Sequence, residues 1–289
     1  MSEFEKLLES YQARVNQKLE VLLPDDDSIL ISAMRYSVLN GGKRLRPILA
    51  YLTGELNDTE AEYIDTLASS LELIHCYSLI HDDLPAMDDD ELRRGNPTTH
   101  KKFDEATAIL AGDALQPLAF ELISTIKTSD RNKVQMINSL SEACGYLGMV
   151  GGQIKDINSN QIKDVESLDS MHSEKTGRLI QASIETAGIL SGLSASDIES
   201  LKEYGGKIGL AFQIQDDIID IESPASVSGK DQGSDIGKDK TTYPSLVGLE
   251  ASKVRAQELS NDAKKILQPI NKNTDNLDKL ADYIVSRKA

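Results

Sequence analysis

Apolar residues recur at helical spacing along most of this 289-residue chain. Ile64, Leu67, Leu71 and Ile74, for example, form one stripe at intervals of three and four residues, and Asp65 lies off it. This spacing is typical of amphipathic helices. Similar patterns predict helices over 3–22, 28–39, 44–56, 64–80, 98–126, 132–150, 166–191, 196–221, 244–266 and 275–287. Strand signals are almost absent, so the pattern predicts an all-α fold in a single domain, 1–289.

Polar segments with Gly or Pro separate the predicted helices. They fall at 23–27, 40–42, 85–97, 151–160, 191–192 and 223–240. The last segment is the longest and follows an acidic cluster. We therefore expect it to act as a mobile lid or a phosphate-binding loop, and not as a linker between domains.

Composition supports the helical prediction and limits the possible partners. Hydrophobic residues make up 39% of the chain and aromatic residues only 4%, without Trp, so Leu, Ile, Val and Ala must fill the core. The net charge of −16 argues against nucleic acid or an anionic membrane as a partner, because both require a basic surface. Cys76 and Cys144 form no disulfide framework, and no signal peptide or membrane-spanning stretch is expected. We expect a soluble cytoplasmic protein without stable membrane association.

Two dense acidic clusters each follow an apolar helical run. They are Asp82-Asp83-Leu84-Pro85-Ala86-Met87-Asp88 and Asp216-Asp217-Ile218-Ile219-Asp220. Carboxylates at this density repel one another, and beside a core they need a neutralising cation. Oxygen-only ligands suit Mg²⁺, which combines one or two carboxylates with substrate phosphates. Basic residues recur near both clusters: Lys43, Arg46, Arg93, Arg94, Lys175, Lys230 and Lys240. The chain is therefore predicted to bind a diphosphate between metal ions and cationic side chains.

The two clusters differ in their expected geometry. Offsets of three and four residues place Gln213, Asp216, Asp217 and Asp220 on one helix face, where a merely solvated acidic face is the alternative. In the first cluster Asp88 lies six residues beyond Asp82, so a turn at Pro85 must bring it back if both bind metal.

Three further residues near the first cluster have both a structural and a functional interpretation. His75 lies about two helical turns before Asp82, and a lone His in an apolar helix is usually a core residue. Its alignment with Ser78 and Asp82 favours a place in the lining of a cavity. Arg93 and Arg94 either form surface ion pairs with nearby carboxylates or grip phosphate in bidentate fashion.

Five motifs together resemble the trans-isoprenyl diphosphate synthases. The first cluster, continued by Leu92-Arg93-Arg94-Gly95, and the second cluster resemble the two aspartate-rich motifs of that family. Gly41-Gly42-Lys43-Arg44-Leu45-Arg46-Pro47, Lys175-Thr176-Gly177 and Lys240-Thr241-Thr242-Tyr243-Pro244 match its other signatures. The resemblance covers the whole chain in the right order, and the end of the chain is similar to bacterial farnesyl diphosphate synthases.

This resemblance implies a large helical bundle around a central cavity, a homodimer and three Mg²⁺ ions. It also implies site residues for both substrates and for the metal. The metal ligands would be Asp82, Asp83, Asp88, Asp216 and Asp220. Isopentenyl diphosphate would be bound by Lys43, Arg46, His75 and Arg94. The allylic diphosphate would be bound by Arg93, Lys175, Thr176, Gln213, Lys230 and Lys240. The residues expected to carry the chemistry are Lys175, Asp82 and Asp216.

The implied reaction is the condensation of isopentenyl diphosphate with dimethylallyl or geranyl diphosphate. Tyr77 and Ser78 lie roughly 6–7.5 Å down the helix from Asp82, so the ring of Tyr77 would form a floor under a growing prenyl chain. The resemblance to bacterial farnesyl diphosphate synthases implies that this floor limits the product to farnesyl (C15) diphosphate. Tyr77 could equally be an ordinary packed aromatic. Four other functions stay open: a geranylgeranyl (C20) diphosphate synthase, a terpene cyclase, a non-catalytic subunit of a heteromeric synthase and a metal-dependent phosphohydrolase.

Overall fold

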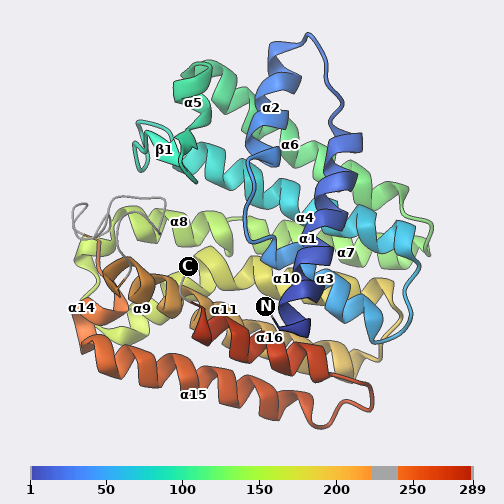
Figure 1. The fold of residues 1–289 in the computed structure, drawn as a ribbon, viewed down its shortest axis with the longest axis vertical. Helices are drawn as coiled ribbons and strands as arrows, with labels where there is room; N and C mark the ends of the chain where they lie inside the picture. The colour runs from blue at the N-terminus through green and yellow to red at the C-terminus, as the bar shows by residue number, and fades with distance from the viewer. Residues whose placement is uncertain (1, 223–239, 288–289) are drawn as a thin grey trace. The chain divides into compact units, whose positions relative to one another are not determined.

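The computed structural model describes residues 2–222 and 240–287. Lys230, and with it the predicted lid up to residue 239, lies outside the described residues. The chain divides into two compact units, Met1–Ile137 and Asn138–Ala289. In the described part nearly all regular structure is helical (Figure 1), which confirms the predicted all-α class. The prediction of a single domain stays a prediction.

The first unit is built around helix α4 (Ala61–Asp82). Four other helices pack against it: α1 (Glu3–Leu22), α2 (Ile29–Leu39), α3 (Leu45–Glu55) and α6 (Glu105–Thr125) (Figure 1). Because α4 is covered on several sides, more than half of its residues are buried, including the polar Ser69, Ser70 and Glu72. A two-stranded hairpin, β1 (Leu92–Arg93) and β2 (Asn96–Pro97), and the short helix α5 (Thr99–Lys102) connect α4 to α6.

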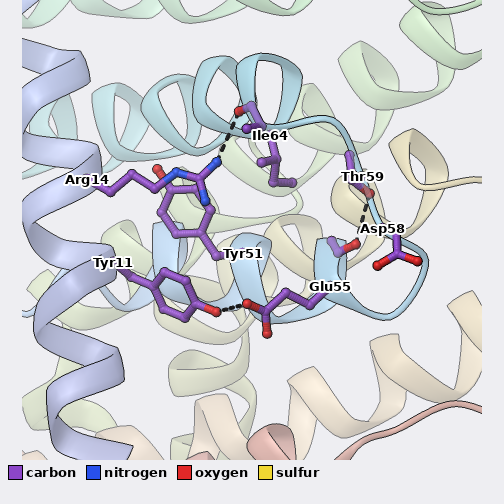
Figure 2. A pocket seen from close by; sticks show the side chains of 9 residues that line it. Tyr11, Arg14, Tyr51, Glu55, Asp58, Thr59 and Ile64 are labelled. Carbon is purple, nitrogen blue, oxygen red and sulfur yellow. Dashed lines mark hydrogen bonds between the residues drawn. The ribbon is translucent and has the colours of Figure 1, made fainter.

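A pocket of about 190 Å³ lies where α1 meets α3 and α4 (Figure 2). Tyr11 and Tyr51 stack there with ring centroids 5.1 Å apart, and Arg14 lies 4.6 Å over the Tyr51 ring. The Tyr11 hydroxyl donates to Glu55 within the pocket (Figure 2). Arg14 Nε also contacts Asp65 of α4 at 2.6 Å. The pocket lies at the start of α4, about 30 Å along the helix from Asp82. The contacts around the pocket join α1 to α3 and α4. The pocket is not the site predicted from sequence.

The second unit is centred on α11 (Ala195–Glu222). This long helix packs against α10 (Arg178–Leu190), α15 (Leu249–Leu267) and α16 (Asp275–Ser286) (Figure 1). The smaller elements are α8 (Met149–Ile157), the 3₁₀ turn η1 (Ser159–Gln161), α9 (Val165–His172), the π-helical turn η2 (Ser173–Gly177) and α14 (Tyr243–Val247). Helix α7 (Asp130–Cys144) begins in the first unit and ends in the second.

Several helix boundaries differ from the sequence prediction. The helix predicted over 132–150 ends at Cys144, and the helix predicted over 244–266 is divided into α14 and α15. The expected break at 151–160 is wrong, because α8 continues through Gly151 and Gly152 to Ile157. These glycines allow close packing: a Cβ on Gly152 would overlap with the backbone nitrogen of Lys175 in η2. The predicted helix over 98–126 is instead divided into α5 and α6, since Asp104 caps α6 by accepting a 2.8 Å hydrogen bond from the Thr107 amide.

Helix α6 also differs from the expectation that no segment resembles a membrane span. Its most apolar 18-residue window has a mean hydropathy of 1.3, so by length and composition alone it could cross a bilayer. Within the first unit, however, α6 packs against α4, α2 and α5. Core helices of soluble proteins share this composition.

Candidate functional site

The first acidic cluster lies at the end of α4 in the first unit. Asp82 is the last helical residue, as expected from the Pro85 that follows. The chain then turns back, so that the Asp88 amide donates a 2.9 Å hydrogen bond to the Asp82 carbonyl. This confirms the prediction that a turn at Pro85 returns Asp88 to the neighbourhood of Asp82.

Asp83 is more buried than Asp82 and Asp88. Its carboxylate is buried and accepts hydrogen bonds from Arg93 Nε at 2.7 and 2.9 Å and from Arg93 Nη2 at 2.5 Å. Burial raises the pKa of Asp83, and Arg93 counteracts this effect. Asp83 therefore anchors Arg93 to the end of α4, and a role for Asp83 as a metal ligand stays a prediction.

The turn of the β-hairpin meets the glycine loop that precedes α3. Arg94 has a left-handed backbone (φ 55°), and its Nη1 donates to the Gly41 carbonyl. The backbone of Gly42 (φ 123°) lies in a region that favours glycine, and a Cβ there would lie 2.6 Å from Arg94 Nη2. The structure thus brings together two predicted ligands of isopentenyl diphosphate, Arg94 and the loop that carries Lys43.

Arg46 and His75 belong to the same cationic region. Arg46 is 9% exposed, and its Nε lacks a hydrogen-bond partner among the described residues. Burial lowers the pKa of Arg46 to about 10. The pKa of His75 is held well below its usual range, first by desolvation and then by the positive charges of Arg46 and Arg94. A buried guanidinium with an unused donor favours the binding of an anion.

The second acidic cluster lies on α11 in the second unit. Asp217 is buried and accepts hydrogen bonds from the Tyr243 amide (2.9 Å) and from Gln213 Nε2 (3.3 Å). It therefore has a structural role, in keeping with its omission from the predicted metal ligands. Asp216 and Asp220 are more exposed, and Asp216 pairs with Arg287 Nη2 at 2.7 Å.

Three of the residues predicted to bind the allylic diphosphate lie next to a close contact between η2 and α11. A Cβ on Gly209 would lie 3.0 Å from Gly177 Cα, so the two backbones approach closely. One turn further along α11, the Thr176 hydroxyl donates a 3.0 Å hydrogen bond to Gln213 Oε1. Lys175, the neighbour of Thr176, donates to Asp156 Oδ2 at 2.8 Å.

The acidic clusters fit a Mg²⁺ ion that also binds substrate phosphates better than they fit a metal ion whose ligands all come from the protein. Among residues 2–222 and 240–287, no three His, Cys, Asp or Glu side chains are grouped as a metal cage. Mg²⁺ needs no such cage, because it usually takes one or two carboxylates and completes its shell with phosphate oxygens and water. The pair formed by Asp82 and Asp88, and the pair formed by Asp216 and Asp220, match this donor set.

Residues 27–284 match the family model described as polyprenyl synthetase. The chain is a member of the polyprenyl synthetase family. It is 44% identical to the farnesyl diphosphate synthase of Escherichia coli K12 over 99% of each chain. It is also 41% identical to a chloroplastic geranylgeranyl pyrophosphate synthase of Capsicum annuum, over 94% of this chain and 76% of the relative.

Solved structures agree with this membership. A geranyltransferase from Helicobacter pylori, crystallised with magnesium and isoprenyl diphosphate, has a TM-score of 0.85 and 33% identity. The likeness covers 99% of this chain and 97% of that one.

Two residues of this polyprenyl synthetase were missed in the sequence analysis. Asp156 accepts hydrogen bonds from both Lys175 and Lys240. Arg287 contacts Asp216 and lies 4.2 Å over the ring of Phe212. Each partner is separated from the missed residue by 19 to 84 positions, so no local pattern in the sequence marks these contacts.

Proposed function

We propose that this chain is a farnesyl diphosphate synthase, a prenyltransferase of isoprene biosynthesis. It condenses isopentenyl diphosphate with dimethylallyl or geranyl diphosphate and releases (2E,6E)-farnesyl diphosphate and diphosphate. Family membership and the full-length similarity to a named farnesyl diphosphate synthase support this function.

The observation that carries the proposal is the cationic region of the first unit. Buried Arg46 has an unused Nε, and Arg94 and His75 lie in the same region. This region is separate in sequence from the lysines of the second unit, so the chain provides two sets of phosphate-binding groups. A coupling enzyme needs both sets, whereas a terpene cyclase or a phosphohydrolase needs only one.

In the proposed reaction the allylic C–O bond breaks and negative charge grows on the departing diphosphate. Lys175, Lys240 and Arg93 would stabilise this charge as fixed hydrogen-bond donors. Arg93 is suited to this role because Asp83 engages its Nε and Nη2, which leaves Nη1 for a phosphate oxygen. The side-chain carbonyl of Gln213, which accepts a hydrogen bond from Thr176, would face the allylic cation.

Mg²⁺ held by Asp82 and Asp88 and by Asp216 and Asp220 would act as a Lewis acid on the same diphosphate. We propose three ions, in line with the family resemblance. The chain's own carboxylates supply only part of each coordination shell, so the metal should bind together with the substrate.

The second substrate would be held by Lys43, Arg46 and Arg94 through its diphosphate. His75, with its depressed pKa, is neutral near pH 7 and would contribute a hydrogen bond without charge. The double bond of isopentenyl diphosphate attacks the allylic cation, and a proton is then lost to the departing diphosphate. Exclusion of water is required, because water would otherwise capture the cation as an alcohol.

Tyr77 is the residue that we propose limits the product to C15. It is 5% exposed and lies edge-on to His81, with ring centroids 5.8 Å apart. Tyr77 lies on α4 five residues before Asp82, and this position supports a role at the end of the growing prenyl chain. Ser78 bonds to its own helix through the His75 carbonyl, so Tyr77 provides most of the bulk at this depth.

We further propose a cytoplasmic homodimer. Helix α8 exposes Val150, Ile154 and Ile157 at spacings of four and three residues, with exposed fractions of 50%, 60% and 46%. Such an apolar stripe is costly in water, and a second copy of the chain would cover it. Both cysteines are buried and unpaired, as expected in a reducing compartment.

The function is tested by incubating the purified protein with Mg²⁺, isopentenyl diphosphate and geranyl diphosphate, followed by analysis of the released alcohols. Farnesol after phosphatase treatment is the expected product. Geranylgeraniol would indicate the C20 synthase, and geraniol formed without phosphatase would indicate a phosphohydrolase. Cyclic hydrocarbons would indicate a cyclase, and the absence of any product would indicate a non-catalytic subunit.

A further inference from the structure

One carboxylate oxygen in the second unit bonds to two lysines. Asp156 Oδ2 accepts from Lys175 Nζ at 2.8 Å and from Lys240 Nζ at 2.9 Å. The two ammonium nitrogens therefore lie within about 5.7 Å of each other. Asp156 comes from α8, Lys175 from η2 and Lys240 from the segment before α14, so this contact joins three distant parts of the sequence.

The carboxylate is buried and charged. Asp156 is 7% exposed, and the side chains of Lys175 and Lys240 are 25% and 17% exposed. Burial by itself would raise the pKa of Asp156, but the two ammonium groups outweigh it and lower the pKa to about 2. A buried charge of this kind persists only where opposite charges compensate it.

The packing of α8 explains how the carboxylate reaches the lysines. Met149, Gly152 and Asp156 form the buried face of α8 at intervals of three and four residues. Gly152 allows α8 to approach the backbone of Lys175. Asp156, one turn further along, then faces the ammonium group of the same lysine.

We propose that Asp156 is a positioning residue that holds the ammonium groups of Lys175 and Lys240 together, ready for the departing diphosphate. The inference rests on the proposed function. Two ammonium groups at this separation repel each other, and lysine side chains have many rotamers. A shared carboxylate offsets the repulsion and fixes both donors before charge develops on the leaving group, when fixed donors are most effective.

A purely structural role is the alternative, because the same contacts link α8, η2 and the segment before α14. The two roles predict different kinetics. A positioning residue should affect kcat for coupling, whereas a structural contact should affect the unfolding midpoint and both KM values together.

The test compares Asp156→Asn, Asp156→Glu and the control Glu174→Gln. Glu174 lies next to Lys175 in η2 and pairs with Lys155 of α8 at 2.5 Å, so the control removes an ion pair between the same two elements. For Asp156→Asn we expect kcat with geranyl diphosphate to fall about 100-fold. The KM for isopentenyl diphosphate should stay within about twofold, and Asp156→Glu should recover at least about tenfold of the lost kcat.

Glu174→Gln should keep kcat within about twofold of the wild type. The proposal is overturned if Asp156→Asn retains more than about one third of the wild-type kcat. It is also overturned if the loss of kcat in Glu174→Gln equals the loss in Asp156→Asn. It is also overturned if Asp156→Glu recovers nothing although it is folded. Failure of the wild type to couple the substrates would instead refute the proposed function, so the two failures are distinguishable.

Discussion

At the scale of single residues, an ion pair inside the first unit supports the segment that carries Lys43 and, at the start of α3, Arg46. Arg44 Nη1 contacts Glu72 Oε1 at 2.7 Å, and the two side chains are 0% and 1% exposed. Arg44 also donates to the Val38 carbonyl and adopts a left-handed backbone (φ 51°) just before α3. Glu72 thus fixes the residue between the two predicted phosphate ligands.

Glu72→Ala should lower the free energy of unfolding by about 3–5 kcal/mol, because it leaves the Arg44 guanidinium buried without its counter-charge. Chemical denaturation measures this change. The control Glu62→Ala removes an exposed carboxylate from the same helix and should change stability by less than about 0.5 kcal/mol. A loss of similar size in both variants would contradict the role given to Glu72.

Tyr77→Ala should yield products longer than C15, because removal of the buried ring lengthens the space available to the prenyl chain. Chromatography of the dephosphorylated products measures chain length. Tyr63→Ala, on the same helix but near its other end, should leave the C15 product unchanged. An unchanged product profile in Tyr77→Ala would remove Tyr77 from this role.

At the scale of elements, close backbone contacts determine where the side chains of the second unit lie. Gly152 lets α8 approach η2, and Gly209 lets η2 approach α11. The sequence predicts a break at the glycines of α8, because glycine lowers helix propensity and frequently marks loops. A helix whose glycines serve packing cannot be distinguished from a loop until its neighbour is known.

Gly152→Ala should destabilise the protein by about 1–3 kcal/mol, since the new Cβ would overlap with the Lys175 backbone. Gly177→Ala is the matched control, because its Cβ would meet only atoms 3.9 Å away. Better helix propensity should leave it neutral or up to about 1 kcal/mol more stable. Thermal unfolding compares the two variants, and equal stability would contradict the packing argument.

At the scale of the whole molecule, the sequence predicted those features that depend on local pattern. The helix ranges follow from amphipathic spacing, and the return of Asp88 to Asp82 follows from Pro85. The contacts of Asp156 and Arg287 could not be predicted, because they depend on how distant segments pack. The ion pair between Arg93 and Asp83 was expected only as a surface contact, because the burial of Asp83 depends on packing around the end of α4.

The proposed homodimer should sediment with about twice the 31.6 kDa mass of the chain. Ile154→Glu places a charge in the exposed stripe of α8 and should shift the protein towards the monomer. Val254→Glu makes the same change at a 58% exposed position on α15 and should leave the dimer intact. A wild-type protein that sediments as a monomer at micromolar concentration would contradict the assembly.

The most direct test of the central proposal, that both acidic clusters act on one departing diphosphate, is the turnover of Asp82→Ala, Asp216→Ala and the double variant at saturating Mg²⁺. Circular dichroism should first confirm that each variant is folded. Each single variant should lose at least about 1,000-fold in kcat, and the double variant should lose little more, because residues that act as a unit are not additive. Turnover within about threefold of the wild type in either folded single variant would contradict the account.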